Sequence, residues 1–261
     1  MKAFLIAISF LTRIPYRTED DIDDKTWQDS LIFYPFCGFI IGLLSVLPFI
    51  ILILLNKTNY FYINDLAIIA ISAFLYVVIS EYMTRLLHFD GFCDCLDAFS
   101  AMTISKERRL EIMKDPLVGS SGVAGGALLL IGKIICLLFV CFKYICFSGN
   151  YLEIIILLML VPMLARFSIV LLASIGKYPR KSGTAFSTVG KVGIKITLFA
   201  FVTILPIMGI DIRHWIMFVI ILLSVFYWKK KSDKALGGVT GDVLGACCET
   251  AELAMLFVIL L

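Results

Sequence analysis

Long blocks of apolar residues constrain this chain more than any other feature of its sequence. Most of them approach the roughly 20 residues that a helix needs to cross a bilayer, and they lack the alternation of a lipid-spanning barrel. Hydrophobic residues make up 61% of the 261 residues and charged residues only 16%, which excludes an ordinary soluble domain. The sequence therefore predicts a single all-α, membrane-embedded domain over residues 1–261, a polytopic bundle of about seven transmembrane helices. The expected spans are 31–55, 66–87, 119–147, 151–175, 192–209, 214–228 and 243–261.

Lysine and arginine are unevenly distributed among the segments that join these spans. Short cytoplasmic loops of membrane proteins carry the excess of positive charge. The segment before the first span and every second segment after it hold clusters of lysine and arginine, whereas the others hold at most one such residue. This alternation predicts a multi-pass protein of the cell membrane, with its N-terminus in the cytoplasm and its C-terminus outside. The net charge of +3 does not indicate a nucleic-acid partner, so the lipid bilayer is the expected environment.

Two segments depart from the simple pattern of spans. The block 214–228 is short, so we expect it to be tilted or partly interfacial. Met1–Leu11 is apolar after Lys2, but no small-residue cleavage site follows it, and we expect an interfacial or re-entrant helix there. The eight cysteines form no CxxC pair, and packing is their main interpretation. The alternative is that Cys93 and Cys95, which flank an acidic cluster, bind a metal with His88, although the neighbouring carboxylates suit a harder ion.

Three aspartates follow the second block at helical spacing. Asp90, Asp94 and Asp97 stand at i, i+4 and i+7, which places them on one face of a helix. Carboxylates on one stripe repel each other unless a cation bridges them, and all-oxygen ligation suits Mg²⁺. The alternative is a solvated acidic face in a cytoplasmic loop. Apolar residues interleave with the acids and the stripe adjoins a membrane span, so the pattern favours a metal site.

A glycine-rich turn precedes the last block. Gly237, Gly238, Thr240 and Gly241 lead into Asp242, and backbone N–H groups of such a turn at a helix start can approach a phosphate. Glu249 and Glu252 follow Asp242 at i+7 and i+10, on the same helix face but inside an expected span, where ionisable groups generally face a polar cavity. The alternative is a plain turn with Asp242 as the helix cap, which explains Asp242 but leaves both glutamates unexplained.

Other polar residues lie near the expected cytoplasmic ends. Glu81 and Arg85 form either an i, i+4 ion pair or part of the site together with His88. Arg166, inside the fourth block, is expected to pair with an acid or reach a phosphate. Lys114 and Asp115 precede a small-residue segment and join the candidate site. The cations of the fifth segment, Lys177, Arg180 and Lys181, are interpreted mainly as topology determinants, with phosphate attraction as a secondary role.

Two acidic stripes, glycine-rich helix entries and nearby cations describe a site for a metal ion and a phosphate-bearing substrate. Phosphoryl transfer requires in-line positioning and charge neutralisation more than covalent chemistry by the protein. The same motifs, in order along nearly the whole chain, resemble those of the cobalamin synthase family, also called adenosylcobinamide-GDP ribazoletransferase. The matching stretches are Phe10-Leu11-Thr12-Arg13-Ile14-Pro15, Phe33-Tyr34-Pro35 with Gly38 and Gly42, His88-Phe89-Asp90-Gly91 with Asp94 and Asp97, Lys114-Asp115 with Gly119, and Gly237-Gly238-Val239-Thr240-Gly241-Asp242 with Gly245, Glu249 and Glu252.

The resemblance implies the joining step of the vitamin B12 nucleotide loop. A ribose hydroxyl of α-ribazole, or of its 5′-phosphate, attacks the phosphate of adenosylcobinamide-GDP nearest the corrinoid, and GMP departs. It implies Mg²⁺ as the metal, held by Asp90, Asp94 and Asp97, with Asp242 and Glu249 binding a second ion or orienting the nucleophile. Phosphate and substrate contacts are expected from Gly237, Gly238, Thr240, Gly241, His88, Arg166, Lys114, Asp115 and Glu252. Lys114 stands where the family pattern has an arginine, and the oligomeric state is left open.

Two other functions fit parts of the pattern. A CDP-alcohol phosphotransferase also uses an Asp-Gly element and acids on membrane helices, but its fuller motif is missing after Asp90-Gly91. An ion-coupled transporter would place binding groups near the midplane, often in paired repeats, whereas these acids cluster at cytoplasmic ends and no repeat is visible.

Overall fold

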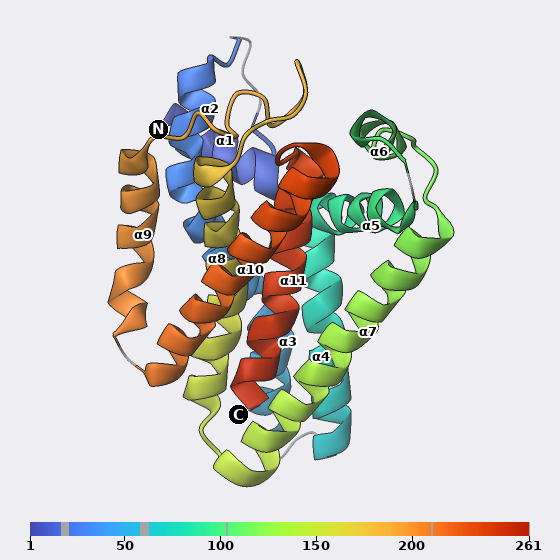
Figure 1. Ribbon diagram of the computed structural model, residues 1–261. Helices are drawn as coiled ribbons and strands as arrows, with labels where there is room; N and C mark the ends of the chain where they lie inside the picture. The colour runs from blue at the N-terminus through green and yellow to red at the C-terminus, as the bar shows by residue number, and fades with distance from the viewer. Residues whose placement is uncertain (17–20, 58–62, 103, 210, 261) are drawn as a thin grey trace.

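The computed structural model describes residues 1–16, 21–57, 63–102, 104–209 and 211–260. Within these ranges the chain forms eleven α-helices and no strand, which confirms the all-α prediction (Figure 1). A 3₁₀ turn, η1 (Leu31–Phe33), precedes α3, and a π-helical segment, η2 (Lys143–Ser148), extends α7. The α-helices are α1 (Lys2–Leu11), α2 (Asp24–Ser30), α3 (Tyr34–Lys57), α4 (Asp65–Met83), α5 (Leu87–Ser100), α6 (Lys106–Ile112), α7 (Ser120–Phe142), α8 (Tyr151–Ile175), α9 (Ile194–Met208), α10 (Ile212–Leu236) and α11 (Gly241–Leu260).

The long helices coincide with the expected spans. Among the described residues, six helices are long and apolar enough to cross a membrane, namely α3, α4, α7 with η2, α8, α10 and α11. The fifth expected block, 192–209, forms α9, which is apolar but has only 15 residues. The expectation that 214–228 is the short span is wrong, because α10 has 25 residues and continues through the lysines that follow the apolar block.

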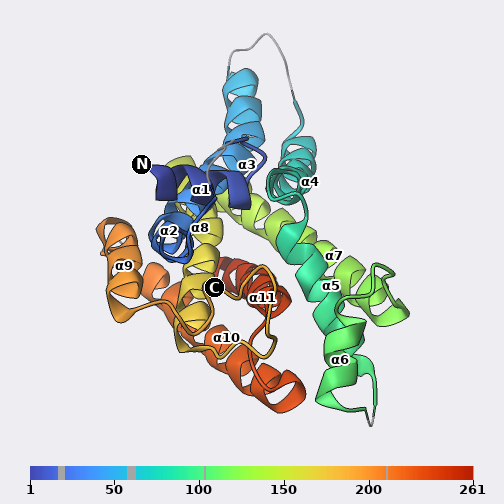
Figure 2. The ribbon, with the colours of Figure 1, turned by 90° about the horizontal axis from the view of Figure 1, so that it is seen from above.

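Helices α8 and α11 form the centre of the bundle and are the most deeply buried of the long helices (Figure 2). Small residues allow the closest helix contacts, as is common in membrane bundles. A Cβ atom at Gly38 of α3 would lie 2.3 Å from the carbonyl oxygen of Pro162 in α8, and one at Gly42 would lie 2.7 Å from that of Met159. No larger residue fits at Gly38 or Gly42 without separating α3 from α8.

The chain turns sharply between α4 and α5. Arg85 and Leu86 have φ angles of 57° and 60°, in the left-handed region that residues other than glycine seldom adopt. Helix α5 consequently leaves the direction of α4 and lies across one end of the bundle (Figure 1). The Arg85 guanidinium donates hydrogen bonds to the carbonyl oxygens of Ser9 (2.7 Å) and Phe10 (2.9 Å), which holds the end of α1 beside this turn.

Candidate functional site

The aspartate stripe lies on α5, as the sequence predicts. Helix α5 spans Leu87–Ser100 and carries Asp90, Asp94 and Asp97 across the end of the bundle. Asp90 is exposed, whereas Asp94 and Asp97 are half-buried. Burial and the neighbouring carboxylates of Asp90, Asp242 and Asp97 raise the pKa of Asp94 to about 7. The stripe therefore concentrates negative charge at one membrane-flanking surface.

Helices α5 and α11 cross in contact where the two predicted acidic motifs meet. A Cβ atom at Gly91 of α5 would lie 2.7 Å from the Cα atom of Asp242, and one at Gly245 of α11 would lie 2.9 Å from the carbonyl oxygen of His88. The two glycines allow this approach because they lack side chains. As a result Asp242, at the start of α11, lies beside the α5 stripe although about 150 residues separate them in the sequence.

Asp97 has a different role from the other two aspartates of the stripe. Its carboxylate accepts hydrogen bonds from the backbone N–H groups of Gly119 (2.7 Å) and Gly122 (2.8 Å). These groups belong to the first turn of α7, where N–H groups lack partners within the helix. A carboxylate at a helix N-terminus is stabilising, so Asp97 caps α7. The geometry favours this role over the predicted metal ligation by Asp97.

The glycine-rich turn is shaped by backbone packing. Gly237 has a φ angle of 78°, and a Cβ atom at Gly238 would lie 2.1 Å from the carbonyl oxygen of Lys177. That same oxygen accepts a hydrogen bond from the N–H group of Val239 at 2.8 Å. The Thr240 hydroxyl donates to a carboxylate oxygen of Asp242 (3.2 Å), which orients that side chain. The turn at the start of α11 is confirmed, and its role as a phosphate cradle stays a prediction.

Arg180 contributes to the site more directly than its sequence context indicates. It lies in the segment after α8, and its guanidinium is 3.9 Å from a carboxylate oxygen of Asp242. One terminal nitrogen donates to the carbonyl oxygen of Leu110 (3.2 Å), whereas the buried Nε atom has no hydrogen-bond partner among the described residues. Since buried donors are nearly always paired, Arg180 retains capacity for an anionic ligand. Arginine binds phosphate well because its charged, planar guanidinium can donate two parallel hydrogen bonds.

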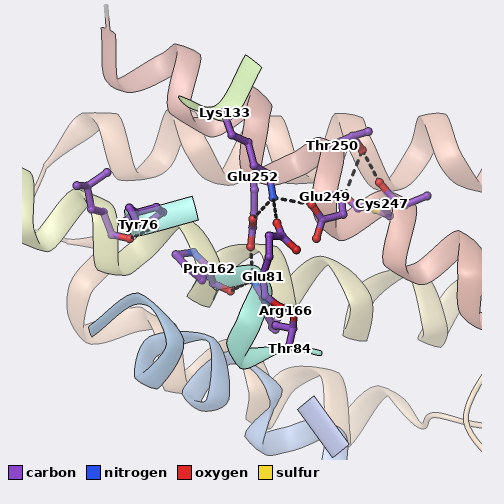
Figure 3. Close-up of polar contacts among 12 residues, drawn as sticks. Tyr76, Glu81, Thr84, Lys133, Pro162, Arg166, Cys247, Glu249, Thr250 and Glu252 are labelled. Atoms are coloured by element: carbon purple, nitrogen blue, oxygen red, sulfur yellow. Dashed lines mark hydrogen bonds and ion pairs between the residues drawn. The ribbon is translucent and has the colours of Figure 1, made fainter. Parts of the chain in front are cut away.

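A second set of charged residues is buried inside the bundle (Figure 3). The Lys133 ammonium on α7 contacts the carboxylates of Glu81 (2.9 Å), Glu249 (2.5 Å) and Glu252 (2.7 Å). Arg166 on α8 pairs with the other carboxylate oxygen of Glu252. All five side chains are at most 8% exposed. We call these residues the buried ionic cluster, and it ties four helices of the bundle together.

The buried ionic cluster accounts for several predicted site residues. Within the described part of the chain, one group of possible metal ligands has all its ligand atoms within 4.8 Å of one another, and it consists of Glu81, Glu249 and Glu252. The Lys133 ammonium contacts all three carboxylates. The expected pairing of Arg166 with an acid is confirmed. The i, i+4 pair of Glu81 with Arg85 does not form, because the helix breaks between them.

Glu249 and Glu252 lie deeper in the bundle than Asp242. Seven residues of helix separate Asp242 from Glu249, a rise of about 10 Å along the axis. Both glutamates are almost fully buried and bonded to Lys133. The geometry therefore favours a structural role for them, and their predicted catalytic and substrate-binding roles are untested.

The remaining predicted site residues fall into two groups. His88 lies at the α5–α11 crossing, where burial and the nearby Arg166 lower its pKa to about 3, so its imidazole is neutral at physiological pH. Lys114 and Asp115 are exposed in the segment before α7, and the Asp115 carboxylate accepts the N–H group of Leu117 (3.0 Å). Among the described residues, neither Lys114 nor Asp115 has an ion pair or hydrogen bond to the acids of α5 or α11.

A cavity opens beside the α5–α11 crossing. Its lining includes His88 and Asp90 of α5, Asp242 of α11, and Thr184 and Thr188 of the segment before α9. Helices α1 and α2 contribute aromatic and aliphatic residues to the same lining. The exposed aspartate of α5 and the first acid of α11 thus share one hollow that a ligand can enter.

A family model described as cobalamin-5-phosphate synthase matches residues 3–260 of the chain. The chain belongs to this family.

Sequence similarity to two relatives extends over nearly the whole of this chain and of each relative. A protein of Clostridioides difficile (strain 630) is 30% identical over 273 residues, covering 100% of this chain and 98% of the relative. One from Alkaliphilus oremlandii (strain OhILAs) is 32% identical, covering 97% of this chain and 94% of the relative. Both carry the name adenosylcobinamide-GDP ribazoletransferase. No solved structure matches this chain.

Lys133 is a buried charged residue that the sequence analysis did not single out. Its signal in the sequence is its position as a lone cation within the apolar block 119–147, because a charge inside a span requires a partner. Arg180 was interpreted mainly as a topology determinant, and its contact with Asp242 depends on the fold of the segment after α8.

Proposed function

We propose that this chain joins the cobinamide-phosphate group of adenosylcobinamide-GDP to α-ribazole or its 5′-phosphate. A ribose hydroxyl attacks the phosphate nearest the corrinoid, the phosphoanhydride bond to GMP breaks, and adenosylcobalamin or its 5′-phosphate is formed. The proposal rests on membership of the family together with one observation. Asp90 and Asp242 line one cavity where α5 crosses α11, Asp94 lies near both of them, and Arg180 lies close to Asp242.

The aspartates at this crossing offer only oxygen ligands, which suit a divalent cation. Burial and the neighbouring carboxylates of Asp90, Asp242 and Asp97 raise the pKa of Asp94. In the described part of the chain the ligand atoms of Asp90, Asp94 and Asp242 do not all lie within 4.8 Å of one another, so a bound cation would draw these side chains closer together. We assign Mg²⁺ to Asp90, Asp94 and Asp242, which replaces the predicted Asp97 with an acid of α11. When bound, Mg²⁺ would neutralise charge on the phosphate oxygens of the donor.

The protein itself would position the two substrates. Arg180, which has an unpaired Nε atom, supports the phosphates of the donor from the side of Asp242. The carboxylates at the cavity supply the base for the proton of the attacking hydroxyl. Thr240 holds the Asp242 side chain in place through its hydroxyl. These roles require orientation and electrostatics, which dominate phosphoryl-transfer catalysis.

The proposed site faces the cytoplasm. Four cations, Lys106, Arg109, Lys231 and Lys234, surround a groove beside Phe99 at the same end of the bundle as α5. An excess of lysine and arginine at one end is typical of the cytoplasmic side. The acids and the cavity would then be accessible to the soluble nucleotide substrates in the cytoplasm.

Product analysis with purified protein in detergent tests the proposal. Adenosylcobinamide-GDP, α-ribazole and Mg²⁺ are supplied with and without a chelator, and GMP and the new corrinoid are quantified by chromatography. Equal amounts of GMP and cobalamin that disappear with the chelator would support both the reaction and the metal. Conversion of a CDP-alcohol lipid in place of these substrates would overturn the proposal.

A further inference from the structure

The cavity beside Asp90 and Asp242 has an aromatic wall that the phosphoryl-transfer chemistry does not require. Phe10, Trp27 and Tyr34 line it, and Phe10 contacts both of the others. The Phe10 ring meets Trp27 edge to face at a centroid distance of 5.4 Å and is inclined by 24° to the Tyr34 ring at a centroid distance of 6.5 Å. Leu31, Ile169 and Leu244 add aliphatic surface. A wall of this composition suits a planar apolar ring.

The aromatic wall is held in place by polar contacts outside the cavity. The Gln28 amide of α2 donates to the carbonyl oxygen of Ser187 (3.1 Å), and the Ser187 hydroxyl donates to the Asp24 carboxylate (2.5 Å). These bonds connect α2 to the segment that carries Ala185 and Thr188, which also line the cavity. Arg85 fixes the end of α1, where Phe10 lies, through the carbonyl oxygens of Ser9 and Phe10. Contacts outside the cavity therefore hold α1 and α2 in position.

The cavity also has polar side chains in its lining, namely His88, Asp90, Thr184, Thr188 and Asp242. The Thr188 hydroxyl already donates to the carbonyl oxygen of Ala185 at 3.2 Å. His88 is 5% exposed, and its Nε2 atom has no hydrogen-bond partner among the described residues. A buried ring nitrogen without a partner is uncommon and indicates an unfilled position for a ligand atom. The occupant should combine an apolar ring for the aromatic wall with polar groups for His88, Asp90 and Asp242.

We infer that this cavity binds the aromatic base of the acceptor nucleoside, with its ribose directed toward Asp90 and Asp242. The inference rests on the proposed function and assigns a location to one of its two substrates. The base of α-ribazole is a dimethylbenzimidazole, a planar ring whose outer edge carries two methyl groups and no hydrogen-bond donor. Guanine, the base of the donor, presents several donors and acceptors along its edge. Burying them against Trp27, Leu31 and Ile169 would leave them unpaired, which is costly.

Steady-state kinetics of two cavity variants tests the inference. Trp27→Leu removes an aromatic face, and Ala185→Leu fills part of the cavity. Loss of one aromatic stacking partner should raise KM for α-ribazole at least about fivefold. In both variants we expect kcat and KM for adenosylcobinamide-GDP to stay within twofold of the parent protein. Ala185→Leu should further discriminate between acceptors, raising KM more for α-ribazole than for the riboside of unmethylated benzimidazole.

Phe226→Leu serves as the matched control, because Phe226 on α10 is 65% exposed and lies outside the cavity lining. Only variants that elute as the parent does in size-exclusion chromatography are compared. A raised KM for the donor with an unchanged KM for α-ribazole would overturn the inference and place guanine in the cavity. Unchanged KM values for both substrates in both variants would also overturn it. Failure of the parent protein to form product would instead reject the proposed function.

Discussion

Asp97 differs from the other aspartates of α5 in what its carboxylate contacts. Asp90 and Asp94 lie near Asp242, whereas both oxygens of Asp97 accept N–H groups at the start of α7. A Cβ atom at Gly119 or Gly122 would lie 2.5 Å from these oxygens, so the two glycines serve the same contact. Aspartates on one face of a helix can therefore have different roles: Asp90 and Asp94 belong to the proposed site, and Asp97 caps α7.

Asp97→Asn should weaken the fold without altering the metal requirement. An amide can accept only one of the two N–H groups, and loss of a helix cap costs about 0.5–2 kcal/mol. We expect a lower thermal midpoint in detergent and an unchanged Mg²⁺ concentration for half-maximal turnover. A large increase in that Mg²⁺ concentration would instead show Asp97 to be a metal ligand.

Lys133 is the common partner of three buried glutamates. Lys133→Met should destabilise the protein by about 3–5 kcal/mol, because it leaves buried carboxylates without a cation. Adding Glu249→Gln removes one of those charges, so the double variant should unfold at a higher temperature than Lys133→Met alone. Thermal unfolding of the single and double variants measures this coupling. Strictly additive losses would contradict the buried ionic cluster.

At the scale of elements, the crossing of α5 and α11 brings the two acidic motifs together. It depends on glycines at the contact and on the turn at Arg85 and Leu86 that lays α5 across the bundle. Helix α2 and the segment before α9 then complete the cavity around the crossing. The site is therefore a product of helix packing as much as of its acidic residues.

Gly91→Ala should disturb the site directly. The added methyl group would lie 2.7 Å from the Cα atom of Asp242, so α5 and α11 must separate. We expect turnover to fall at least about tenfold and stability to fall by about 1–3 kcal/mol, the usual cost of overpacking. Gly132→Ala on α7 is the matched control, because its nearest neighbour would be 3.4 Å away. Equal turnover in Gly91→Ala and the parent would argue against a tight crossing.

Local features of the site could be predicted from the sequence, and long-range contacts could not. Helical spacing correctly placed the aspartates on one helix, and the glycine-rich turn correctly marked the start of α11. The break between α4 and α5 has no glycine or proline to signal it. The capping of α7 by Asp97 and the meeting of Lys133 with Glu81 and Glu249 depend on tertiary packing between distant segments.

At the scale of the whole molecule, α9 determines how the termini lie relative to the membrane. An N-terminus in the cytoplasm and a C-terminus outside require an odd number of crossings. The six long helices alone would leave both termini on one side. Helix α9 has 15 residues and extends about 22 Å, shorter than the roughly 30 Å hydrocarbon core. Figure 1 shows the two termini toward opposite ends of the bundle, with α9 at the left edge and approaching α10 at its lower end.

Epitope accessibility tests whether α9 crosses. We expect an epitope after residue 261 to be reached by antibody in intact spheroplasts, and one before Met1 to be reached only after permeabilisation. This result follows if all seven apolar blocks cross the membrane. Detection of both epitopes under the same condition would indicate six crossings and leave α9 at the interface.

The measurement that addresses the central claim most directly is GMP release by Asp90→Asn, Asp94→Asn and Asp242→Asn. Asp65→Asn is the matched control, because Asp65 is exposed in the first turn of α4 and belongs to none of the proposed sites. The three site variants should retain membrane insertion and size-exclusion behaviour. Their turnover should fall at least about a hundredfold, as expected when the groups that would hold a charge-neutralising cation are removed. Asp65→Asn should match the parent protein. Near-parental turnover in the three site variants would contradict a reaction site at the crossing of α5 and α11.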